Sequence, residues 1–147
     1  MVLYRDEWWE DELVDLNRLL NPQGLNWWTV VSGMGMNFVL TSFLLLGGAS
    51  LAAQGGSQVV GTLIVAGGAF LIPLATAYIC GRMMGERFLA YGMYPLAGFL
   101  IVAVAGVLST GAFGLLFIGF GLLGAFNGAT LAARWAMRRR HTIEKEE

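Results

Sequence analysis

The sequence predicts an all-α membrane protein with four transmembrane helices in two hairpins, preceded by a short amphipathic N-terminal helix. Of its 147 residues, 56% are hydrophobic and only 13% are charged, about half the charged fraction of a soluble domain. No Asp, Glu, Lys, Arg or His occurs in residues 19–81 or 88–133. Each of these stretches is long enough for two helices of about 20 residues and a short turn. Neither stretch shows the polar face that a soluble helix pair requires.

Residues 1–26 form a separate polar segment at the N-terminus. The spacing of Trp9, Leu13, Leu16 and Leu20 places these side chains on one face of a helix, and the NPQG sequence at 21–24 then ends it. The segment contains two arginines and six acidic residues, so its net charge is −4. Because anionic lipid headgroups repel such a segment, we expect it to dock on a protein partner through Trp8, Trp9, Leu13, Leu16 and Leu20.

The four predicted spans occupy a membrane domain of residues 27–137, which is followed by a charged tail of residues 138–147. We place the spans at Trp28–Ser50, Gln58–Cys80, Leu89–Ser109 and Phe113–Trp135. Tryptophan is typical of the membrane–water interface, and arginines fix the orientation of the helix end that they flank. The predicted topology anchors are therefore Trp27, Trp28, Trp135, Arg138, Arg139 and Arg140.

The distribution of basic residues predicts the orientation of the chain. With four spans, both termini and the loop at residues 81–88 lie on one side of the membrane, and all nine Lys and Arg residues fall on that side. The positive-inside rule makes that side cytoplasmic. An odd number of spans would have divided the basic residues between the two sides. We therefore expect an integral protein of a prokaryotic plasma membrane with both termini in the cytoplasm.

Small residues recur every fourth position in the last span and also occur in the second. Helix association in lipid depends on close backbone approach, which such residues permit. Two interpretations are open: the rows pack the four helices against each other, or two adjacent rows exceed that need and contact another chain. The predicted helix-packing interface comprises Gly121, Gly124, Ala125, Gly128, Ala129, Ala132, Ala77 and Gly81.

The predicted spans contain few groups capable of chemistry, and we predict no catalytic, cofactor-binding or metal site. The single histidine, His141, lies in the tail, and Cys80 is the only cysteine. The notable polar residues within the spans are Asn37, Thr41, Thr76 and Asn127. Threonine can bond to its own helix, but asparagine is expected to face protein, either in an interhelical hydrogen bond or along a solute path.

These features favour a non-catalytic accessory or scaffolding subunit of a larger integral membrane complex, which packs through its small-residue helix faces. The alternative is a small homo-oligomeric channel or transporter for a neutral or weakly polar solute, lined by Asn37, Thr41, Thr76 and Asn127. An enzyme is disfavoured because the spans offer no nucleophile and base in combination. The expected partners are other membrane-protein subunits or further copies of the chain within the lipid bilayer, and no nucleic acid.

Overall fold

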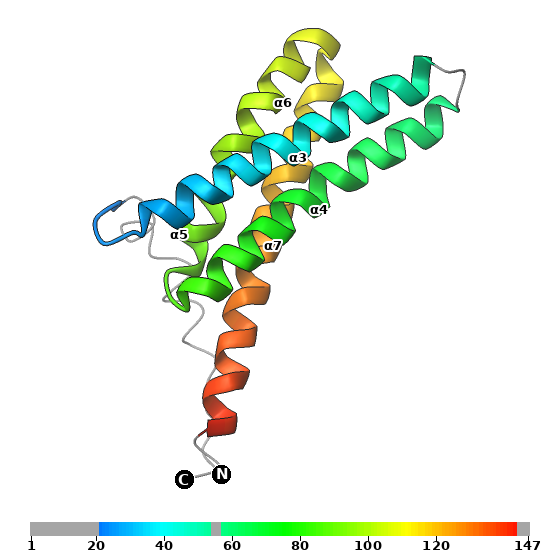
Figure 1. The fold of residues 1–147 in the computed structure, drawn as a ribbon. Helices are drawn as coiled ribbons and strands as arrows, with labels where there is room; N and C mark the ends of the chain where they lie inside the picture. The colour runs from blue at the N-terminus through cyan, green and yellow to red at the C-terminus, as the bar shows by residue number, and fades with distance from the viewer. Residues whose placement is uncertain (1–20, 54–56, 144–147) are drawn as a thin grey trace.

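The described residues form helices joined by short turns, and no strand occurs among them. The computed structural model describes residues 21–53 and 57–143, so the predicted docking residues between Trp8 and Leu20 lie outside the described part. The helices are α3 (Trp27–Ala53), α4 (Gln58–Met84), α5 (Phe88–Met93), α6 (Leu96–Thr110) and α7 (Ala112–Ile143), as Figure 1 shows. Four stretches are long and apolar enough to cross a bilayer: Trp27–Leu51, Gln58–Met84, Phe88–Leu108 and Gly114–Arg139. The predicted all-α class is confirmed for the described residues, and four helical stretches have the length and composition that the predicted spans require.

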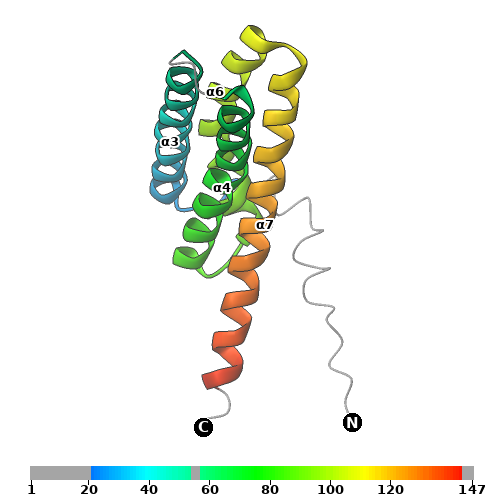
Figure 2. The same cartoon turned by 90° about the vertical axis from the view of Figure 1, so that its right-hand side faces the viewer.

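The four spans are arranged around α4 and α7, which share the most extensive interface in the described chain. Helix α3 lies beside α4, and α6 lies beside the first half of α7 (Figures 1 and 2). The two pairs diverge toward the end of the bundle where α3 connects to α4 and α6 connects to α7, which we call the neutral end. The opposite end, which we call the basic end, carries Arg82, Arg87, Arg134, Arg138 and Arg139. There α7 extends beyond the other helices (Figure 2).

The third predicted span, Leu89–Ser109, consists of two helices rather than one. Helix α5 ends and α6 begins around Pro95, which has no backbone N–H and whose ring excludes the carbonyl of Tyr91 four residues earlier. The carbonyl of Pro95 accepts a hydrogen bond of 3.2 Å from the amide of Gly98, a tight turn that interrupts the regular ladder. The break leaves this carbonyl within reach of a neighbouring helix. Pro73, in contrast, lies inside the continuous helix α4.

Glycines of α7 make very close contacts with the backbone of α4. A Cβ atom built at Gly124 would overlap the carbonyl of Phe70, and one at Gly128 would overlap the carbonyl of Leu74. No side chain larger than hydrogen therefore fits at either position without separating the helices. Dense contact of this kind is what holds helices together in lipid, where apolar burial alone provides little driving force.

The neighbouring row of small residues on α7 faces α5 and α6. A Cβ atom at Gly121 would overlap the ring of Phe99, and one at Gly92 would lie 2.9 Å from the Cβ of Ala129. All eight residues of the predicted packing interface are buried: Gly121, Gly124, Ala125, Gly128, Ala129, Ala132, Ala77 and Gly81. Both rows thus pack against helices of the same chain, which is the first of the two interpretations above.

Candidate functional site

Three of the four predicted intramembrane polar residues are buried in the interior of the bundle. Asn37 and Thr41 lie on one face of α3, because they are four residues apart, and Thr76 lies on α4. Their exposed fractions are 1% for Asn37 and 0% for both threonines. We call these three residues the polar cluster.

Asn37 connects three separate segments of the chain. Its Nδ2 donates a hydrogen bond of 2.9 Å to the carbonyl of Pro95, at the break between α5 and α6. Its Oδ1 lies 2.8 Å from the hydroxyl of Thr76, which is also 3.0 Å from the carbonyl of Ile72. Because a hydroxyl has one hydrogen, Thr76 shares its donation between these two acceptors. The sequence-based prediction did not include this acceptor, and Pro95 within an apolar span is the sequence feature that could have indicated it.

The hydroxyl of Thr41 is buried without a hydrogen-bond partner. Leaving a hydroxyl unpaired in an apolar interior costs about 1–3 kcal/mol. Thr41 lies one turn along α3 from Asn37 toward the neutral end, and Leu45 follows after a further turn. The hydroxyl is the one buried side-chain oxygen or nitrogen in the described chain that lacks a partner.

Asn127 does not join the polar cluster. It is exposed on the surface of α7, and its Nδ2 donates a hydrogen bond of 2.8 Å to the carbonyl of Leu123 in the same helix. The prediction that the asparagines face protein therefore holds for Asn37 but not for Asn127 within a single chain. Helical periodicity alone does not reveal this difference, because both asparagines lie in spans that are apolar on all sides.

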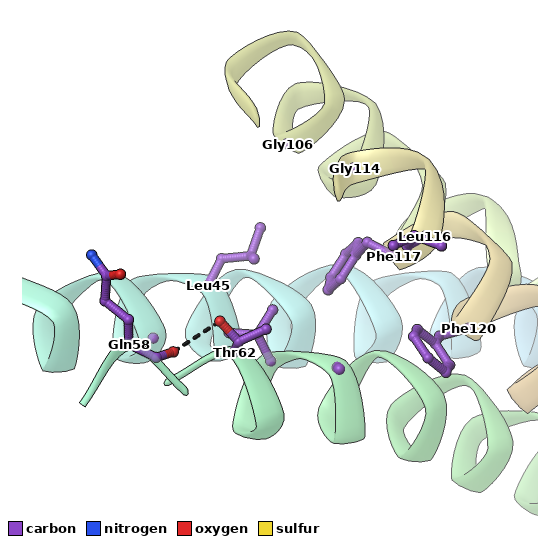
Figure 3. Close-up of a pocket in the computed structure, with 11 residues that line it drawn as sticks. Leu45, Gln58, Thr62, Gly106, Gly114, Leu116, Phe117 and Phe120 are labelled. Carbon is purple, nitrogen blue, oxygen red and sulfur yellow. Dashed lines mark hydrogen bonds between the residues drawn. The ribbon is translucent and has the colours of Figure 1, made fainter. Parts of the chain in front are cut away.

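An apolar cleft opens between the diverging helix pairs at the neutral end (Figure 3). Its volume is about 480 Å³, within the range of roughly 300–1,000 Å³ that is typical of ligand pockets. The cleft draws residues from α3, α4, α6 and α7, and no sequence pattern predicted it because its walls share no single periodicity. The lining residues are Leu45, Gly48, Gln58, Thr62, Val65, Ala66, Gly106, Gly114, Leu116, Phe117 and Phe120.

The polar atoms of the cleft are few, and its inner wall is aromatic. The Thr62 hydroxyl donates a hydrogen bond of 2.8 Å to the Gln58 carbonyl of its own helix, as Figure 3 shows. Phe117 stacks on the buried ring of Phe99, with ring centroids 5.0 Å apart and an interplanar angle of 21°. None of the described residues that line the cleft is charged. The arrangement therefore suits an apolar occupant.

At the basic end, arginines from two helices converge on one indole ring. The guanidinium carbon of Arg82 on α4 lies 4.3 Å from the ring centroid of Trp135 on α7, and that of Arg139 lies 5.5 Å from it. Both distances are within the range of cation–π interactions. The contact of Arg82 with Trp135 joins α4 to α7, whereas Arg139 contacts Trp135 within α7. The sequence predicted both Trp135 and Arg139 as topology anchors. Arg138 and Arg140 lie in the last turns of α7.

Hydrogen bonds connect the segment before α3 to Arg87 in the loop between α4 and α5. The guanidinium of Arg87 donates hydrogen bonds to the carbonyls of Gln23, at 2.5 Å, and Asn21, at 3.5 Å. Trp27 packs edge-on against the ring of Tyr94, with centroids 6.2 Å apart. Trp28 is 80% exposed, which suits an anchor at the membrane surface.

Within the described residues, no group of three or more His, Cys, Asp or Glu side chains is placed to hold a metal ion. Cys80 is a buried free cysteine. It lies against α3, where a Cβ atom at Gly33 would be 2.9 Å from its sulfur. Comparisons with protein-family models, curated proteins and solved structures found no match.

Proposed function

We propose that this protein is a non-catalytic accessory subunit of a larger membrane complex, and that its apolar cleft receives a transmembrane helix of another subunit. The observation that carries the proposal is the cleft itself, about 480 Å³ in volume and lined almost entirely by apolar side chains from four helices. Within a bilayer such a cleft has to be filled, because an unfilled space forfeits the dispersion contacts of its walls.

A partner helix fits the cleft better than a polar solute does. Among the described residues, Thr62 is the only hydroxyl side chain in the lining, and it is bonded within its own helix. Phe117 in the lining stacks on Phe99 of the buried core. Because the small-residue rows of α7 are used within the chain, the cleft replaces them as the surface that contacts the partner. Shape and dense packing then determine which helix binds.

The distribution of basic residues supports an orientation of the protein in the membrane. We place the basic end in the cytoplasm of a prokaryotic cell, because all Lys and Arg residues of the sequence fall on that side of four spans. The acidic segment 1–26 then lies on the cytoplasmic side, where it docks on a basic surface of the partner. Its net charge of −4 supports such docking by electrostatic complementarity.

Site-specific photocrosslinking tests this function. A photoreactive side chain at Val65, inside the cleft, is expected to capture a defined partner protein in native membranes. The matched control is Ile79 on the same helix, which is 44% exposed and lies outside the cleft. The variant Ala66→Trp, which fills the cleft, should abolish co-purification of the partner while the thermal midpoint remains unchanged. Equal labelling from both positions, or full co-purification with Ala66→Trp, would contradict the proposal.

A second candidate function, a channel or carrier for a neutral solute, is favoured by one observation. The unpaired hydroxyl of Thr41 lies one helical turn from Leu45, which lines the cleft. A path through the cleft would pass Phe117 and continue along the polar cluster. In reconstituted vesicles this function predicts flux of a small neutral solute that Phe117→Ala raises and Thr41→Val lowers. Vesicles that remain impermeable with both the parent and Phe117→Ala would exclude this function.

A further inference from the structure

The outward side of α7 carries a row of residues with the spacing of a coiled-coil seam. Successive members are separated by four, three, four, three and four residues, the alternation that keeps one helix face against a partner helix. All are exposed except Thr130, which is half-buried. We call this row the α7 seam, and its members are Leu116, Phe120, Leu123, Asn127, Thr130 and Arg134.

The centre of the α7 seam is a polar group at a depth where lipid offers no hydrogen bonds. Asn127 lies well inside the span Gly114–Arg139. One Nδ2 hydrogen is bonded to the carbonyl of Leu123, but the side-chain Oδ1 and the second N–H of Asn127 make no hydrogen bond within the described chain. Exposed to hydrocarbon, these groups remain unsatisfied at substantial cost in free energy. A partner that supplies both a donor and an acceptor at this depth removes that cost.

A second copy of the chain meets this requirement without any further assumption. Copies inserted in the same orientation present Asn127 at the same depth, and an amide carries both a donor and an acceptor, so it is complementary to itself across a two-fold axis. Asparagine at a core position of a parallel two-stranded coiled coil is also known to fix register and oligomeric state. We propose that the protein forms a parallel homodimer through the α7 seam, with the two Asn127 side chains hydrogen-bonded to one another.

The remaining sides of α7 are compatible with this dimer. The side opposite the seam is occupied by α4, α5 and α6 of the same chain through the small-residue contacts described above. Leu116 and Phe120 belong both to the seam and to the wall of the cleft. In the dimer, Leu116 and Phe120 contact the second α7 at the edge of the cleft, and the helix of another subunit proposed above contacts the walls formed by α3, α4 and α6. Arg134 ends the seam near the membrane surface, where water and salt screen the repulsion between like charges.

Disulfide crosslinking in native membranes tests the dimer with Asn127 intact. In a Cys80→Ala background, a single cysteine replaces either Leu123, in the seam, or Leu122, which is also exposed on α7 but lies outside the seam. Oxidation should convert the Leu123→Cys protein to a covalent dimer and leave the Leu122→Cys protein monomeric. Equal crosslinking at the two positions, or no dimer from Leu123→Cys, would overturn the proposed interface.

A second measurement tests the role of Asn127 itself. In sedimentation equilibrium of the full chain in mild detergent, Asn127→Leu should weaken dimerisation about tenfold, the effect expected for loss of one interhelical side-chain hydrogen bond. Asn127→Gln, which keeps an amide, should recover part of the loss. The thermal midpoint of the dissociated monomer should not change in either variant, because the side chain is exposed. Dimerisation of Asn127→Leu with the parent dissociation constant would refute the proposal.

Discussion

The hydroxyl of Thr76 donates a hydrogen bond of 2.8 Å to the Oδ1 of Asn37, which joins α4 to α3 in the interior of the bundle. Through the Nδ2 of Asn37 the connection continues to the Pro95 carbonyl, 2.9 Å away. One asparagine thus holds three segments that are far apart in the sequence. Because the site is fully buried, neither water nor lipid can replace these bonds.

Replacing Asn37 is therefore expected to destabilise the bundle. Asn37→Leu removes the hydrogen bond to the Pro95 carbonyl and leaves the Thr76 hydroxyl bonded only to the Ile72 carbonyl of its own helix. We expect the free energy of unfolding to fall by roughly 1–3 kcal/mol. Thermal or denaturant unfolding in detergent measures this loss. The control is Ser42→Ala, since the Ser42 hydroxyl bonds only to the carbonyl of Phe38 in the same helix. Equal stability of the two variants would show that the interhelical bonds contribute nothing.

Replacing Thr41 by valine, in contrast, should stabilise the bundle. Its hydroxyl is buried and unpaired, so Thr41→Val, which has nearly the same shape, removes a desolvated polar group without leaving a cavity. We expect the free energy of unfolding to rise by about 1 kcal/mol. A loss of stability in the same unfolding assay would mean that the hydroxyl has a partner, such as an internal water. Thr76→Val provides the comparison, because that hydroxyl does have partners.

The contact between α4 and α7 should tolerate no side chain at its closest point. Gly128→Ala places a methyl group against the carbonyl of Leu74, and we expect the helices to separate at a cost of roughly 1–3 kcal/mol. Gly119→Ala on the same helix is the matched control, because a Cβ atom there meets nothing within 4 Å. The two thermal midpoints should differ by several degrees, and coincident midpoints would disprove the tight contact.

The arginine–tryptophan contact at the basic end should make a smaller contribution. Arg82→Ala removes a cation 4.3 Å from the ring of Trp135, and we expect a loss of about 0.5–1 kcal/mol. Arg82→Lys should retain part of this stabilisation because it keeps the charge. Substitution of the exposed neighbour Met83 by alanine serves as the control in unfolding experiments. An Arg82→Ala protein with the stability of the Met83→Ala protein would contradict a role for the contact.

Deletion of residues 1–20 should weaken partner binding without affecting insertion in the membrane. All four spans remain in the shortened chain, so it is expected to insert in the membrane with unchanged yield. The partner should be released more readily, and most clearly at high salt, because the deleted segment carries the acidic cluster. Co-purification followed over a salt series measures the effect. If the shortened chain retains its partner in full at high salt, the segment has no docking role.

The amino-acid sequence determined the membrane class and the number of spans. Charge-free stretches at residues 19–81 and 88–133 have the lengths that four crossings of a hydrocarbon core require. The sequence also identified the small residues that allow close approach, and all eight are buried. These inferences succeed because desolvation of charge and the size of a side chain are local properties of a residue.

Only the tertiary structure decided which neighbour each helix face meets. Asn37 and Asn127 are the same residue type in similarly apolar helices, yet one is buried against the Pro95 carbonyl and the other lies on the surface. Apolar helices carry no hydrophobic face that indicates the interior. Their orientation follows instead from interhelical contacts such as those of Gly124 and Gly128 with α4. The cleft is likewise a product of four helices together, because the two helix pairs diverge where α6 and α7 leave α3 and α4.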